Sequence, residues 1–122
     1  MNYSEFVQRA IEIDKRNTFG KISSQTPIVA PEDLQTFYQN CNPIDVELPY
    51  EGTAIKLFSA EDLPRIQEEY SNIVDAFVFA SCNGDPICFR DGKILMWPHG
   101  VDEAHAELLC DDFNSFILSL VE

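Results

Sequence analysis

The 122-residue sequence is poor in basic side chains, and it has no long apolar run. Eight lysines and arginines stand against 21 aspartates and glutamates, for a formal net charge of −13. A surface this negative repels nucleic acid and anionic lipid. No apolar run approaches the roughly 18 residues that span a bilayer, and the first residues lack the basic start of a signal peptide. The sequence therefore predicts a soluble, cytoplasmic protein without direct nucleic-acid or membrane partners.

Motifs for catalysis or cofactor binding are also missing. Five scattered glycines form neither a phosphate-binding loop nor a dinucleotide fingerprint, and no G-x-S-x-G or H-E-x-x-H occurs. The four cysteines contain no C-x-x-C pair, and three of them lie in apolar stretches that are typical of core positions. A zinc site from His99, Asp102, Glu103 and His105 is conceivable, but this spacing matches no usual ligand pattern. We predict a non-enzymatic protein without metal or cofactor.

The composition is that of a globular domain, with 45% hydrophobic and 24% charged residues. No linker or repeat divides the chain, so we expect a single domain over residues 1–122. Leu34, Phe37, Tyr38 and Cys41 recur at helical spacing after Pro31, which suits a first helical position. Similar apolar stripes predict the other helices, and the expected helices lie near residues 3–16, 31–41, 60–70 and 111–121.

The strongest strand signal lies between residues 76 and 97. Ala76 to Cys82 is apolar except at Ser81, as in a strand that is covered on both faces and central in its sheet. Asn83-Gly84 and Asp91-Gly92 supply turns, so the stretch reads as an antiparallel meander. Shorter strands are expected at 45–49, 53–58 and 106–109, with a loop or short extended piece at 17–26. The fold class is therefore α+β, with a mostly antiparallel central sheet. Four phenylalanines should be largely buried: Phe77, Phe79, Phe89 and Phe113.

The order of these segments resembles that of a known superfamily. The matching pieces are Pro31–Tyr38, Leu57–Leu63, Phe79–Phe89 with Gly84-Asp85-Pro86-Ile87 at its centre, Gly92-Lys93-Ile94 followed by His99, and Phe113–Leu120. In this order they resemble the SUKH superfamily of bacterial immunity proteins, which share a fold with a fungal cell-wall assembly regulator. The resemblance covers roughly residues 28–121. One departure is Asn40-Cys41-Asn42-Pro43, where members usually have Asn-Gly after the early helix.

The resemblance connects the acidic charge to a role in binding a partner. It implies a bacterial immunity protein that binds and neutralises a cognate protein toxin. The charge favours a basic toxin, such as a nuclease or another enzyme with a basic cleft, through electrostatic steering. The alternative is a non-enzymatic regulatory adaptor on the same fold. The acids could also do no more than keep the chain in solution.

Loops carry recognition more often than the scaffold does, so the candidate partner-binding residues lie in turns and at strand ends. Asp85 and Asp91 occupy the two ends of a predicted strand. Trp97 or His99 could serve as an anchor at the centre of the surface, although core packing is the favoured role of Trp97 because it ends an inner strand. The remaining candidates follow the meander in the chain: Asp102, Glu103, Asp111 and Asp112.

Overall fold

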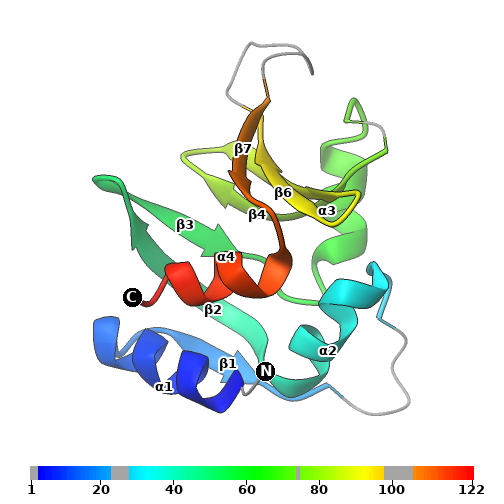
Figure 1. The fold of residues 1–122 in the computed structure, drawn as a ribbon. Coiled ribbons are helices and arrows are strands. Elements are labelled where there is room, and N and C mark those ends of the chain that lie inside the picture. Colours follow the sequence, from blue (N-terminus) through cyan, green and yellow to red (C-terminus); the bar gives the residue numbers. More distant parts are fainter. Residues whose placement is uncertain (1–2, 23–27, 74, 98–105) are drawn as a thin grey trace.

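The computed structural model describes residues 3–22, 28–73, 75–97 and 106–122. One antiparallel sheet of seven strands runs through it, and the strands lie in the sheet in chain order (Figure 1). The strands are β1 (Thr18–Gly20), β2 (Asn42–Tyr50), β3 (Thr53–Leu57), β4 (Phe77–Cys82), β5 (Asp85–Arg90), β6 (Lys93–Met96) and β7 (Glu107–Cys110). The helices are α1 (Tyr3–Ile13), α2 (Glu32–Asn40), α3 (Leu63–Glu69) and α4 (Phe113–Ser119). The α+β class with an antiparallel sheet is confirmed.

Strand β4 is fourth of the seven, so the prediction of a central strand is correct. Val78, Phe79 and Ala80 are each at most 1% exposed, because the strand is covered on both faces. Phe113 is also buried, as expected. Phe77 and Phe89 pair with each other across β4 and β5; they are less buried than Phe79 and Phe113 but pack against the core.

Aromatic rings connect three helices to the sheet. Phe37 of α2 makes edge-to-face contacts with Tyr3 and Phe6 of α1 and with Phe113 of α4, at centroid distances of 5.5, 5.9 and 5.3 Å. Phe113 in turn contacts Phe79 of β4 at 5.3 Å. Edge-to-face pairs add about 0.5–1.5 kcal/mol beyond the area they bury. This continuous set of rings places α1, α2 and α4 against the sheet.

Three hairpins have the same turn geometry. Glu51-Gly52, Asn83-Gly84 and Asp91-Gly92 each connect two neighbouring strands, and both residues of every turn have positive φ. That is the two-residue type I′ turn, whose twist matches the twist of the strands. Asparagine and aspartate tolerate the first position well, whereas glutamate at Glu51 is an uncommon choice there.

The structure corrects the expectation for residues 40–45. Asn40 ends α2, but Asn42-Pro43 already belongs to β2, which pairs with β1 through Gly20 and Asn42. Asn42 is fully buried, and its side-chain oxygen accepts a 2.8 Å hydrogen bond from the Ala60 N–H. Its amide nitrogen donates to the Glu61 carboxylate at 3.0 Å. These contacts hold an asparagine in a strand where local signals indicate a turn.

The side chain of Gln67 on α3 makes the two backbone hydrogen bonds beside β4 that a neighbouring strand would make. Strand β3 ends at Leu57, so the backbone groups of Val78 extend beyond its last residue. The Gln67 amide donates to the Val78 carbonyl at 2.7 Å and accepts from the Val78 N–H at 2.9 Å. Because Val78 is 1% exposed, these backbone groups would otherwise lack a partner. One side chain thus continues the β3–β4 ladder and fixes α3 to the sheet.

Candidate partner-binding surface

The antiparallel sheet separates the predicted surface residues into two groups. Asp85 begins β5, and Trp97 lies at the same end, because its N–H donates to the Pro86 carbonyl at 3.0 Å. Asp91 lies in the turn at the other end of β5, about 20 Å away for a six-residue strand. Asp111 and Asp112 follow β7, whose Cys110 pairs with Ile94 near that second end. His99, Asp102 and Glu103, as well as His105, lie outside the described residues.

Two acids at the second end, Asp112 and Asp91, have structural roles. Asp112 caps α4: its carboxylate accepts hydrogen bonds from the Ser115 N–H at 2.8 Å and the Ser115 hydroxyl at 2.7 Å. These bonds hold the Asp112 pKa below its usual value. Asp91 occupies the first position of a type I′ turn. Arg90 and Lys93 flank that turn and offset its charge. Asp91 and Asp112 are therefore less suited to attracting a basic partner.

Trp97 is a core residue. It is 7% exposed, and the Arg90 guanidinium carbon lies 5.0 Å from the centroid of its ring. The Arg90 Nε also donates to the Asp75 carbonyl at 3.2 Å, which holds the guanidinium in place. A buried, covered ring offers little area to a partner. Trp97 therefore packs in the core and is not an exposed anchor.

The first end of the sheet has a different character, and we call Glu51, Asp85 and Glu107 the acidic sheet end. These residues come from the β2–β3 turn, the start of β5 and the start of β7. Their charges act together on nearby groups. Burial raises the Tyr50 pKa first, and the Glu51 and Glu107 charges raise it further. The Cys82 pKa is likewise raised by burial and then by Asp85 and Glu51.

Strand coiling explains why Glu107 acts on Tyr50. Tyr50 lies on β2 and Glu107 on β7, which are five strands apart in the sheet order. At about 4.8 Å per strand, a flat sheet would separate them by about 24 Å, and screening would leave little interaction. The sheet twists and coils as antiparallel sheets do, so that the Glu107 charge reaches Tyr50. Within the described residues, Glu51 and Glu107 form no ion pair.

Sequence reasoning missed Glu51, Glu107 and Tyr50 as surface candidates. The Glu51-Gly52 turn can be predicted from the sequence. The glutamate at its first position, where it is an unfavourable choice, is a signal that could have marked Glu51 as a surface candidate. Glu51 has φ of 45°, a conformation that costs a non-glycine residue roughly 1 kcal/mol. The equivalent positions of the other two hairpins carry Asn83 and Asp91, which suit it better. Unfavourable backbone geometry of this kind is often retained for function.

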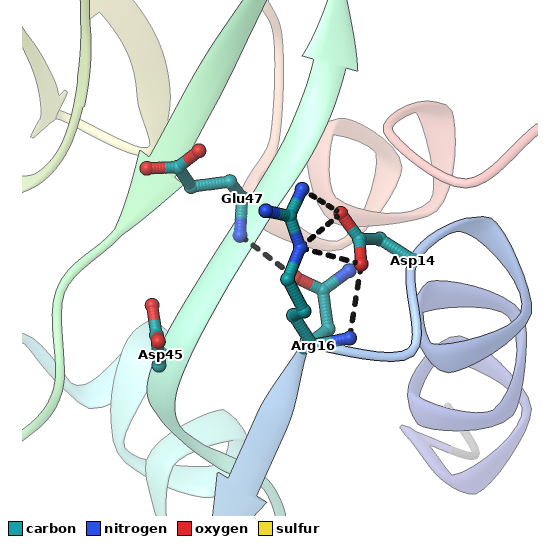
Figure 2. A pocket seen from close by; sticks show the side chains of 5 residues that line it. Asp14, Arg16, Asp45 and Glu47 are labelled. Atoms are coloured by element: carbon teal, nitrogen blue, oxygen red, sulfur yellow. Dashed lines mark hydrogen bonds and ion pairs between the residues drawn. The ribbon is translucent and has the colours of Figure 1, made fainter.

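A second acidic feature is a surface hollow of about 220 Å³, lined by Asp14, Arg16, Asn17, Asp45 and Glu47 (Figure 2). Arg16 donates to Asp14 at 2.7 Å, and this bond lowers the Asp14 pKa to about 2. Asn17 accepts from the Glu47 N–H at 2.9 Å and donates to the Ala10 carbonyl at 2.8 Å. These contacts fasten α1 and β1 to β2. The hollow is thus partly neutralised, and its polar groups serve the fold.

The described residues contain no group of three or more His, Cys, Asp or Glu side chains placed to hold a metal ion. Cys41, Cys82 and Cys88 are buried, as the sequence predicts for small core residues. Burial raises the pKa of the Cys41 and Cys88 thiols to about 12, so neither is a ready nucleophile. In the same part of the chain, no helix is both long and apolar enough to cross a membrane.

Comparison with known proteins identifies the family. The sequence model of the SMI1 / KNR4 family (SUKH-1) matches residues 18–119, from β1 to the last residue of α4. Neither a curated protein nor a solved structure matches the chain. SUKH proteins are commonly immunity proteins against toxins, and they are generally non-catalytic binding modules. Because the match covers most of the chain and every strand of the sheet, this protein belongs to the SMI1 / KNR4 family (SUKH-1).

Proposed function

We propose that this protein is an immunity protein that binds and neutralises a cognate, basic protein toxin. Membership of the SUKH-1 family carries the proposal, because immunity to toxins is the common role of that family. The net charge of −13 indicates the sign of the partner. An enzyme that acts on an anionic substrate, such as a nuclease, has a basic cleft that an acidic protein can block. Neutralisation then needs tight binding and no chemistry.

The acidic sheet end is the proposed contact surface. Glu51, Asp85 and Glu107 project from three separate segments. After burial, the charges of Glu51 and Glu107 are the next causes that raise the Tyr50 pKa, and those of Asp85 and Glu51 the next that raise the Cys82 pKa. Charges beyond a Debye length of about 8 Å are screened, so a local cluster steers a partner more effectively than dispersed acids. Tyr50, partly exposed beside Glu51, replaces Trp97 as the proposed aromatic anchor. Asp102, Glu103 and His99, in the segment between Trp97 and Glu107, remain in the proposed surface.

The experiment measures protection of cells and toxin association for matched charge variants. The candidate toxin is the protein encoded by the gene next to the gene for this chain. Glu51→Lys with Glu107→Lys is compared with Glu5→Lys and Glu12→Lys on α1, which changes the net charge equally. We expect the first pair to slow association about tenfold at low salt and to flatten its salt dependence. The control pair should change it much less.

Two outcomes would contradict different parts of the proposal. Equal loss in both variants, or loss in neither, would remove the acidic sheet end from the interface and leave the immunity role standing. Failure of the unmodified protein to protect cells or to bind the toxin would reject the immunity role, and would favour a regulatory adaptor on the same fold. A Glu51→Asn variant adds a check: it should raise thermal stability while slowing association, because asparagine suits the turn but lacks the charge.

A further inference from the structure

Strand β7 is an edge of the sheet. It is last in the strand order, and within the described ranges no strand pairs with its outer side. Its four residues begin at Glu107, so the edge is continuous with the acidic sheet end. Leu108 is 52% exposed, which shows that its side chain is open to solvent. An exposed edge can pair with a strand of another protein.

The alternation of hydrogen-bonded and non-hydrogen-bonded residue pairs along the meander shows which backbone groups point outward. The two-residue turn after β5 makes Arg90 and Lys93 a hydrogen-bonded pair, and such pairs alternate along an antiparallel ladder. The bond from the Trp97 N–H to the Pro86 carbonyl confirms that alternation. Met96, one residue earlier, therefore turns its backbone groups away from β5 and toward β7.

The same alternation applies to Glu107 and Leu108, which precede the register shift between Ile94 and Leu95. Met96 pairs with Glu107, so the Glu107 backbone bonds to β6. Leu108 pairs with Leu95, and the backbone N–H and C=O of Leu95 point toward β5. The Leu108 N–H and C=O therefore point away from the sheet. They form a donor and an acceptor spaced to accept an eighth strand, and the exposed Leu108 side chain lies beside them.

We propose that the toxin contributes an extended, basic segment that pairs with the outer edge of β7. This inference rests on the proposed function and names its mode of binding. Acids flank the edge on both sides, Glu107 at one end and Asp111 at the other, so lysines or arginines beside the incoming strand are favoured. A second copy of this chain fits poorly, because antiparallel pairing of two β7 strands brings Glu107 of one copy near Glu107 or Asp111 of the other.

The test uses two variants of one residue in the full-length chain. Leu108→Pro removes the outward N–H, and it leaves the β6–β7 ladder intact because that N–H is not used there. Leu108→Thr removes the same leucine side chain but keeps the N–H. Toxin affinity is measured for both by calorimetry, and circular dichroism checks that both are folded. We expect Leu108→Pro to bind at least about tenfold more weakly than Leu108→Thr, from one lost hydrogen bond and the clash of the ring.

Amide hydrogen exchange of the unmodified protein gives a second readout that does not depend on the proline variant folding. Exchange at Leu108 should slow on toxin binding, while exchange in β1, the other edge strand, should not change. Equal affinities of the two variants, or unchanged exchange at Leu108 in a protein that protects cells, would reject edge pairing and leave the immunity function intact. A homodimer formed through β7 would reject the proposed occupant. Failure to bind toxin at all would reject both proposals.

Discussion

Replacing Gln67 by alanine should destabilise the protein far more than its position on a short helix suggests. The Gln67 amide donates to the Val78 and Leu63 carbonyls and accepts from the Val78 N–H. Leu63 precedes it by one helical turn, so its carbonyl keeps access to ordinary helix bonding. The Val78 groups have no such alternative, since Val78 is 1% exposed and β3 has already ended.

The expected cost follows from those two backbone groups. A buried donor or acceptor that loses its partner costs about 1–3 kcal/mol. Two such groups, offset by partial relaxation and by the better helix propensity of alanine, give about 2–4 kcal/mol. With an unfolding entropy of about 2.1 cal/mol/K per residue, that corresponds to a fall in Tm of about 8–16 °C. Urea unfolding and differential scanning calorimetry measure the two quantities.

A Gln67→Glu variant adds a pH test of the same geometry. A neutral carboxylic acid can donate to the Val78 carbonyl and accept from its N–H, but a carboxylate can only accept. The folded state therefore raises the pKa of this glutamate above its unfolded value of about 4.3. The stabilisation is present below that value and is lost as pH rises through the folded pKa. The deficit against the unmodified protein should thus be smallest near pH 4 and largest at neutral pH.

The control is Gln8→Ala on α1, where the glutamine is exposed and makes one 3.4 Å contact with Glu12. Its cost should stay within about 0.5 kcal/mol. Equal costs for Gln67→Ala and Gln8→Ala would refute the argument that Gln67 substitutes for a strand. A Gln67→Glu deficit that does not change with pH would refute the role assigned to the donated hydrogen bond.

Three further predictions concern the core, a helix cap and the thiols. Phe79→Ala should cost about 3–5 kcal/mol in urea unfolding, because the ring is 1% exposed; a cost below 1 kcal/mol would contradict its central place. Asp112→Ala should lower Tm at pH 7, and since the folded pKa of Asp112 is lowered, the difference should shrink in calorimetry as pH falls below about 4. With a thiol reagent at pH 8, half-buried Cys110 should react first, whereas Cys41 and Cys88, with pKa values of about 12, should react only on unfolding; early labelling of Cys88 would argue otherwise.

Local patterns are sufficient to predict the meander. Asn83-Gly84 and Asp91-Gly92 specify their turns within two residues, and the apolar run of β4 is long enough to indicate cover on both faces. Asn42 shows where such patterns fail. Next to Pro43 it indicates the end of a helix, but contacts with Ala60 and Glu61, 18 and 19 residues away, hold it in a strand.

The candidate surface could be predicted only in outline. Placing acids at hairpin ends follows from the turn residues, and Asp85 was identified in this way. Joining it to Glu51 and Glu107 depends on the coiling of the whole sheet, which no local pattern contains. Trp97 shows the opposite limit: an aromatic residue at a strand end can be exposed or covered, and here Arg90, seven residues earlier, covers it.

The agreement between strand order and chain order has a consequence for how this protein folds. Three of its six strand pairs close loops of only two residues, so half of the strand pairings can form by local steps with little loss of chain entropy. The hydrogen bond from Tyr3 to Asn114 is different, because it joins residues 111 positions apart. We therefore expect helix α1, which precedes the region matched by the family, to dock after the hairpins have formed. Substitutions in the hairpins should slow folding, whereas substitutions in the contact between α1 and α4 should mainly accelerate unfolding.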